Sequence, residues 1–290
     1  MTYTMSDQIP QEETAWHRYR VAIYSLVVVP YLIAFFGVVV FTGMRLIVGA
    51  PPSIHSAMDS ISRGSETERW QSALDMISLL RRHAGEQLDQ GFVDQLSFEY
   101  NRAAGERKSF LRTYLALAMG LTRDPRFEPL LLEGINDEDE PNRMAAIKAL
   151  GLVGSAAAEE SILQLLKNEE PVIVLESVVA LGRIGRASAV PALLPLLDHS
   201  EPNIRWDTAI SLAKLGDRTG LPIINELLSR EYFNQFPQVD INEQEKAVLV
   251  AIELALQLRD PIFEDNLIVL SKSDENLTIA NAALLALKEF

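Results

Sequence analysis

Apolar and polar positions alternate along this chain in two different ways. Between Arg20 and Arg45 lie 24 residues without a charged side chain. From about residue 65 onward, apolar residues instead recur at the i, i+3, i+4 spacing of amphipathic helices, and Gly, Pro and charged residues interrupt them. The first pattern predicts one helix in an apolar medium. The second predicts a series of short helices without strands.

The uncharged run predicts a single transmembrane helix over residues 21–48, because a helix that crosses a bilayer needs about 20 apolar residues. Trp16 and Tyr19 precede the run as interfacial anchors. A cleaved signal peptide is the alternative, but its apolar region is normally only about 7–15 residues long. We expect an N-terminal tail (1–20), the anchor (21–48), a linker (49–64) and a helical domain (65–290).

The orientation of this anchor follows from few charges. Arg18 and Arg20 lie on its N-terminal side and Arg45 on the other. By the positive-inside rule, this asymmetry favours a single-pass protein of the plasma or inner membrane whose large domain lies on the outer, periplasmic side. A cytoplasmic domain stays open as the alternative.

The helical domain repeats itself with a period of 31 residues. Ala118-Met119-Gly120 recurs as Ala149-Leu150-Gly151, as Ala180-Leu181-Gly182 and, in altered form, as Ser211-Leu212-Ala213. Gly154, Gly185 and Gly216 share a second register. Each unit holds an Ala-rich helix that stops at such a Gly, in a left-handed cap, and a Leu-rich helix that often starts at a Pro. Neither helix buries its apolar stripe alone, so the units must stack into a solenoid.

The stretches VLESVVALGRIGRASAVPALLPLLDHSEP and NIRWDTAISLAKLGDRTGLPIINELLS resemble HEAT-like repeats of the phycobilisome-lyase type. The resemblance covers residues 106–229 and implies an all-α fold, an α-solenoid of about six helix pairs. It also implies a structural ladder of Arg112, Arg143 and Arg205, which pair with acidic residues of neighbouring units. Val174 interrupts that ladder.

Composition and motifs argue against chemistry in this domain. The net charge is −14 and lies wholly in residues 51–290, so nucleic acid is not an expected partner. The chain has no Cys, and its four His residues do not share the repeat register. It also lacks a phosphate loop, a nucleophile elbow and the HExxH motif. We expect no catalytic residue, metal site or cofactor.

Two sets of residues are candidate partner contacts. Gln164 and Glu226 hold outward positions between the leucines of the second helices, which in HEAT-like stacks are expected to line the concave side. Tyr232, Phe233 and Phe236 lie in a segment, residues 229–242, where the period breaks. We call this segment the aromatic insertion. Its rings either anchor a partner or fold back over the neighbouring repeat.

These observations favour a non-enzymatic scaffold or accessory subunit of a membrane complex, which binds other subunits through its repeats and the membrane through residues 21–48. A tethered adaptor that recruits soluble proteins is one alternative. An enzyme or ligand sensor with a site in the concave groove is an alternative of another class.

Overall fold

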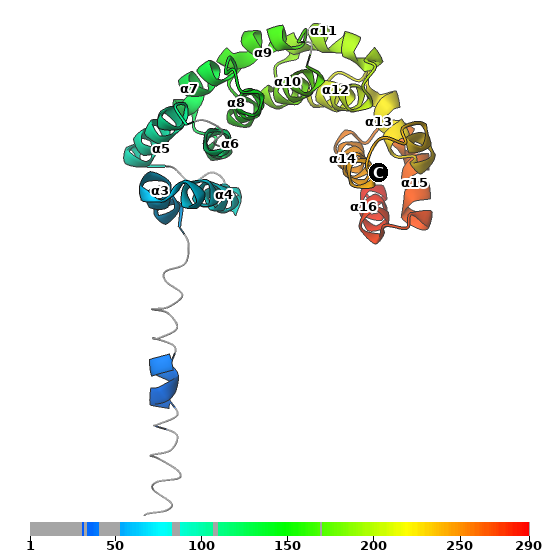
Figure 1. Ribbon diagram of the computed structural model, residues 1–290. Helices are drawn as coiled ribbons and strands as arrows, with labels where there is room; N and C mark the ends of the chain where they lie inside the picture. The colour runs from blue at the N-terminus through cyan, green and yellow to red at the C-terminus, as the bar shows by residue number, and fades with distance from the viewer. Residues whose placement is uncertain are drawn as a thin grey trace, which may run out of the picture. The chain divides into compact units, whose positions relative to one another are not determined.

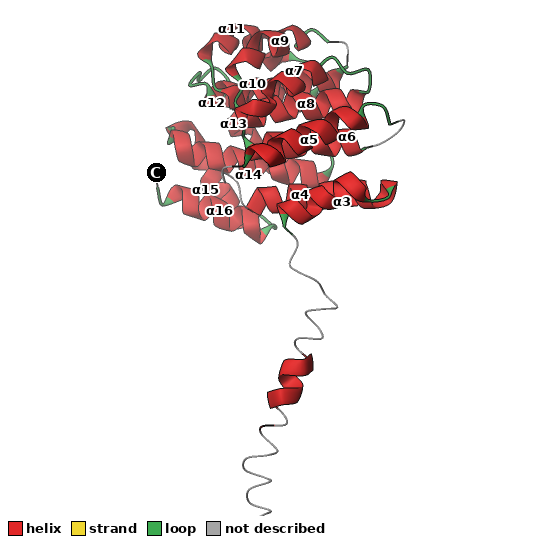
Figure 2. Ribbon diagram, turned by 90° about the vertical axis from the view of Figure 1, so that its left-hand side faces the viewer, coloured by secondary structure: helices red, strands yellow, loops and turns green. Residues whose placement is uncertain are grey.

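The computed structural model describes Tyr31 and residues 34–40, 53–82, 88–106, 110–168 and 170–289. Its chain divides into two compact units, residues 1–52 and residues 53–290. Every regular element in the described part of the chain is a helix, as Figure 2 shows. The predicted all-α fold is therefore confirmed for these residues.

Most of the predicted transmembrane segment, residues 21–48, lies outside the described residues, as does the N-terminal tail. Of that segment, residues 34–40 are helical and their side chains are exposed. Among the residues that the structure describes, none of the helices is both long and apolar enough to span a membrane.

The second unit is a curved stack of seven helix pairs in its described part, arranged in two rows (Figure 1). The outer row comprises α3 (Ile54–Arg63), α5 (Gln90–Ala103), α7 (Glu128–Gly134), α9 (Glu159–Leu165), α11 (Val190–Leu193), α13 (Leu221–Leu227) and α15 (Glu264–Ser273). The inner row comprises α4 (Glu66–Arg82), α6 (Leu111–Thr122), α8 (Glu140–Val153), α10 (Pro171–Ile184), α12 (Pro202–Lys214), α14 (Ile241–Leu258) and α16 (Leu277–Leu287). Short 3₁₀ turns join them, namely η2 (Pro125–Phe127), η3 (Ala156–Ala158), η4 (Ala187–Ala189), η5 (Leu194–Asp198), η6 (Arg230–Gln235) and η7 (Pro261–Phe263).

Glycines in the left-handed region end the inner helices, as the sequence predicts. Gly154 and Gly185 follow α8 and α10 with φ of 75° and 78°. Each donates its backbone N–H to a carbonyl of the last turn, which satisfies an otherwise unpaired acceptor. Arg123 and Arg259 occupy the same conformation after α6 and α14, with φ of 58° and 47°. A side chain strains this backbone, so the two Arg positions are less favourable caps than Gly.

Small residues bring the inner helices together. A Cβ placed on Gly120 of α6 would lie only 2.5 Å from the Cα of Ala149 on α8. One placed on Gly182 of α10 would lie 2.7 Å from the Cβ of Ser211 on α12. No such series of glycines lies in the Leu-rich outer helices. The closer spacing of the inner helices gives the stack its curvature.

This packing corrects the expected placement of the two helix types. The Ala-rich helices α6, α8, α10 and α12 lie on the concave side, and the Leu-rich second helices α7, α9, α11 and α13 lie outside (Figure 1). The reason is physical: the row with the smaller residues at its contacts is the row of shorter spacing, and therefore the inner one.

The expected linker, residues 49–64, differs from the structure as well. Ser53 starts α3 with a capping box in which Ser56 N–H donates to Ser53 Oγ at 3.1 Å and Ser53 N–H to Ser56 Oγ at 2.9 Å. Ala57, Met58 and Ile61 bury one face of α3 against α4. Because α3 pairs with α4, each later pair also begins with an odd-numbered helix, so that α5 pairs with α6 and α7 with α8. The same helices then form seven pairs instead of about six.

Candidate functional site

The inner row opens between α12 and α14. A pocket of about 280 Å³ lies there, and we call it the inner pocket. It is lined by Leu175 of α10, by Asn203, Trp206, Asp207 and Ile210 of α12, and by Glu243, Lys246, Ala247 and Val250 of α14. One carboxylate and one indole thus stand beside aliphatic side chains, with an acidic and a basic residue on the opposite wall.

The pocket exists because α12 and α14 lack the close packing of small residues that joins the preceding inner helices. The left-handed caps of α12 and α14, Gly216 and Arg259, are 43 residues apart instead of 31. In this register Leu254 takes the place of Ser211, so α14 has a large residue at the position where α12 has the small one that meets α10. The two helices accordingly pack much less closely than α10 and α12 do. The hydrophobic core also divides here into two clusters that meet at α12.

The Asp207 carboxyl is half-buried in the wall of this pocket. Its burial raises the pKa to about 6, against the opposing influence of the Lys214 ammonium group. Glu176 adds to the rise and Arg183 opposes it. A carboxylate that is poorly solvated and lacks a close counter-ion is a group that a cationic ligand would stabilise.

The aromatic insertion forms the structure behind Trp206. Phe233 is only 3% exposed, and its ring centroid lies 5.5 Å from that of Trp206, edge to face. Phe236 lies 5.4 Å from Trp206 in a similar arrangement, and the Trp206 indole N–H donates to the Tyr232 hydroxyl at 3.3 Å. The insertion therefore folds back on α12. Phe233 is unavailable to a partner, whereas Tyr232 and Phe236 remain half-buried.

An ion pair fixes the insertion to the C-terminal repeat as well. Arg230 donates from Nε to Asp274 Oδ2 at 2.7 Å and from Nη2 to Oδ1 at 3.0 Å. The Arg230 hydrogen bond lowers the pKa of the Asp274 carboxyl, although burial acts in the opposite direction. The insertion is thus a wedge between α12 and the last helices.

The three ladder arginines make different contacts. Arg112 forms an ion pair with Asp137 and lies 4.7 Å from the centre of the Tyr100 ring. Arg143 reaches Glu170 of the next pair, Nη2 to Oε2, at 2.7 Å.

Arg205, the third ladder residue, forms no ion pair among the described residues. It donates to the carbonyls of His199 and Ser200 at 2.6 and 3.0 Å. Its guanidinium also lies 5.5 Å from the Phe236 ring centre. The carbonyls bonded by Arg143 and Arg205 belong to the loops that lead into α8 and α12, so these contacts hold the turns.

The remaining predicted contact residues lie on the outer row. Gln164 of α9 and Glu226 of α13 are both exposed. Gln164 donates to Glu160 of its own helix at 3.0 Å. The structure therefore does not bring these two residues to the inner pocket. Sequence reasoning missed Asp207 and the inner row because it assigned the concave side to the other helices.

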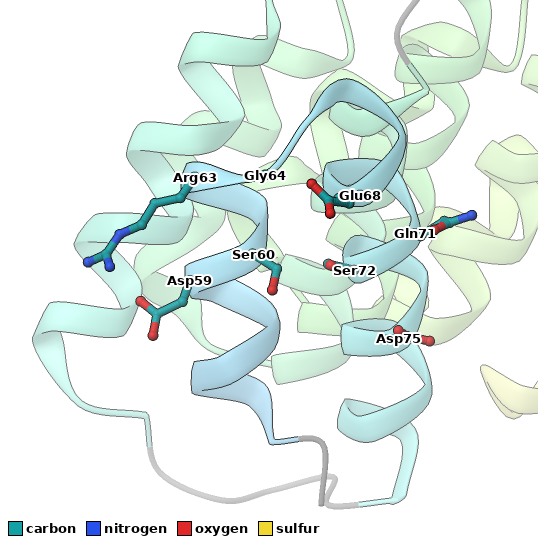
Figure 3. A pocket seen from close by; sticks show the side chains of 8 residues that line it. All are labelled: Asp59, Ser60, Arg63, Gly64, Glu68, Gln71, Ser72 and Asp75. Atoms are coloured by element: carbon teal, nitrogen blue, oxygen red, sulfur yellow. The ribbon is translucent and has the colours of Figure 1, made fainter. Parts of the chain in front are cut away.

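A second pocket, of about 380 Å³, lies between α3 and α4 and is shown in Figure 3. It is lined by Asp59, Ser60, Arg63, Gly64, Glu68, Gln71, Ser72 and Asp75. Asp59 and Arg63 extend from one side of α3, whereas Gln71 and Asp75 extend from α4, so the charges do not converge. Glu68 is occupied as a helix cap, because its carboxylate accepts from Ser65 N–H at 2.8 Å. Within the described ranges, no group of three or more His, Cys, Asp or Glu residues could hold a metal ion.

Comparison with known proteins defines the class of this fold. A family model described as HEAT repeats matches residues 107–174 and 159–233. Residues 107–233 therefore match HEAT repeats, and the described part of the second unit is an α-solenoid. The predicted resemblance to HEAT-like repeats is confirmed for this region. No curated protein matches the chain.

One solved structure shows a similar fold. The complex of CpcE and CpcF of phycocyanin lyase from Nostoc sp. PCC7120 is similar with a TM-score of 0.56 and 17% identity, over 83% of this chain and 95% of that chain. At this identity the likeness defines the fold alone. Human deoxyhypusine hydroxylase in complex with glycerol is less similar, with a TM-score of 0.34 and 14% identity over 81% of this chain and 95% of that chain.

Proposed function

We propose that this chain is a non-enzymatic scaffold or accessory subunit of a membrane complex, anchored through residues 21–48, which binds protein partners along its inner row. The observation that carries the proposal is a pair of exposed apolar side chains at the starts of two inner helices. Phe110, at the start of α6, is 64% exposed, and Val172 of α10 is 41% exposed. Both positions are separated from Asn203, which lines the inner pocket, by a whole number of 31-residue repeats.

Exposed aromatic and aliphatic side chains are typical anchors for a partner. A solenoid offers such a surface over its whole length. The likeness to a structure determined as a complex of two proteins, CpcE and CpcF, agrees with a protein-binding role. The domain charge of −14 favours a basic partner over an acidic one.

The membrane part of the proposal rests on the uncharged run between Arg20 and Arg45. The exposed apolar side chains of residues 34–40 agree with it, since water solvates such side chains poorly. Following the arginine asymmetry, the repeats lie on the outer side of that membrane. The chain should stay in the pellet after alkaline carbonate extraction, and deletion of residues 21–48 should release it. Protease added to intact spheroplasts should digest the repeats. Full protection would place them on the cytoplasmic side.

Partner binding is tested by mild detergent extraction of tagged full-length chain and identification of the proteins that co-purify. Phe110→Glu and Val172→Glu change exposed positions, so the fold should persist, and both should lose the specific partners. The matched control is Gln164→Glu, which adds the same charge on the outer row and should keep them. A monodisperse monomer without partners, or equal recovery by all variants, would refute the proposal.

Two alternatives give different results. A tethered adaptor would release its soluble partners without detergent, whereas complex subunits would remain in the membrane fraction. A ligand sensor or enzyme is the candidate of another class, and the inner pocket is the observation that favours it. Native mass spectrometry and metal analysis of purified chain separate these classes. A stoichiometric small molecule or iron would favour the ligand-binding class.

A further inference from the structure

Asp207 has no counter-ion, although the equivalent acidic residue one repeat earlier has one. Glu176 of α10 holds the same register, and its Oε1 lies 3.5 Å from the Nζ of Lys148 on the preceding inner helix. A step of 31 residues carries Glu176 to Asp207 and Lys148 to Val179. The carboxylate is therefore kept in the next repeat while its cation is replaced by an aliphatic side chain. Among the described residues, no Lys or Arg lies within 4.0 Å of Asp207.

The charged groups around Asp207 do not replace that counter-ion. Arg183 of α10 and Lys214 of α12 act on it only at longer range, and Glu176 opposes them. On the α14 side of the pocket stand Glu243 and Lys246. Three cations and two anions thus surround Asp207, but none of these cations forms an ion pair with it, so the pocket keeps one carboxylate without a dedicated partner.

The space in front of this carboxylate suits an elongated, partly apolar cation. About 280 Å³ is at the lower end of small-molecule sites and is ample for one long side chain. Trp206 and Ile210 form its buried side, and the half-buried Leu175 and Val250 offer aliphatic surface to a methylene stem. A cation near an indole gains a further electrostatic attraction.

We infer that the inner pocket binds one Lys or Arg side chain of a protein partner, with Asp207 accepting its hydrogen bonds and Leu175 and Val250 packing on its stem beside Trp206. This inference rests on the proposed partner binding and specifies its chemistry. Charge-assisted hydrogen bonds from a guanidinium are the strongest that a carboxylate forms. The charge of −14 would draw a basic segment toward the same surface.

The test uses the full chain with 5-fluorotryptophan in place of its three Trp residues, and follows the fluorine signal that Trp206→Phe removes. The probe is Nα-acetyl-arginine amide, and the uncharged isostere Nα-acetyl-citrulline amide is its control. At pH 7.5 the arginine probe should move the Trp206 signal saturably, and the citrulline probe should not. At pH 5 the apparent affinity should fall about tenfold, because burial holds the Asp207 pKa at about 6.

Asp207→Asn, which preserves size, should abolish the movement. Glu226→Gln removes an equal charge from the outer row and should leave it unchanged. No saturable movement with arginine, equal movement with citrulline, or full binding by Asp207→Asn would each overturn the inference. Such a result leaves the proposed function intact if Phe110→Glu and Val172→Glu still lose their partners, so the two failures can be told apart.

Discussion

Gly151 of α8 lies directly against Ala180 of α10: a Cβ on Gly151 would come within 2.8 Å of the Ala180 Cα and 3.0 Å of its Cβ. Both residues sit in helices, so neither can move without shifting a whole turn. This contact joins two repeats of the inner row and is equivalent to the Gly120–Ala149 contact one repeat earlier.

Gly151→Ala should therefore destabilise the solenoid. Helix propensity alone predicts a gain of roughly 0.5–1 kcal/mol for this change, because Ala is the better helix former. Overpacking the contact should outweigh that gain and cost about 1–3 kcal/mol in total. Urea unfolding of the full chain, followed by circular dichroism, gives the sign. A more stable variant would show that the two helices are not in close contact.

Arg123→Gly should stabilise the protein. Arg123 holds a left-handed φ of 58°, whereas Gly154, Gly185 and Gly216 hold the equivalent position in later repeats. Relief of this strain, reduced by the greater freedom of Gly in the unfolded chain, should add about 0.5–1 kcal/mol. The matched control is Gly185→Ala, which should lose stability in the same unfolding assay. Equal melting of Arg123→Gly and the parent chain would contradict the assignment.

Phe233→Ala should weaken the C-terminal part of the stack. It removes a buried ring from the aromatic cluster on Trp206, and loss of a buried Phe typically costs about 3–5 kcal/mol. Tyr232→Phe removes only the hydroxyl that accepts the indole N–H, and should cost about 0.5–1.5 kcal/mol. Chemical denaturation compares the two. Similar small effects would mean that the insertion does not pack on α12.

Asp207→Asn should stabilise the protein at pH 7.5 but not at pH 4. The folded pKa of about 6 lies above the ordinary Asp value of 3.8, so between these values the native state binds more protons than the unfolded state. The stability of the folded state therefore falls as pH rises through this window. Above it, the ionised Asp207 carboxylate destabilises the folded state. The gain at pH 7.5 should be on the order of 1–2 kcal/mol. Thermal melts at both pH values measure it, and a gain independent of pH would point to a cause other than this charge.

The sequence predicted the repeats well because their signals are local. The 31-residue recurrence, the capping glycines and the alternating Ala-rich and Leu-rich helices depend on neighbouring residues only. The choice of concave row was wrong, although the chain contained the relevant signal. Gly120, Gly151 and Gly182 lie within helices, where Gly is unfavourable unless a neighbouring helix approaches closely.

The inner pocket was not predictable in the same way. Its origin depends on matching Leu254 to Ser211 across the aromatic insertion, and the residue that marks this register is Arg259 instead of Gly. The replacement of Lys148 by Val179 opposite Asp207 is visible in the sequence only after the inner helices are known to be neighbours. α3 was assigned to a linker because its short apolar face carries no repeat motif.

The sparse contact between α12 and α14 has a mechanical consequence. A solenoid is held by contacts between adjacent repeats, so its resistance to stretching is that of its weakest joint. Here that joint lies between α12 and α14, where helix contacts are sparse. Under tension along the stack, α13 to α16 should detach as one block before any repeat unwinds. The ion pair of Arg230 and Asp274 should stay intact within that block, because both residues lie on the C-terminal side of the joint.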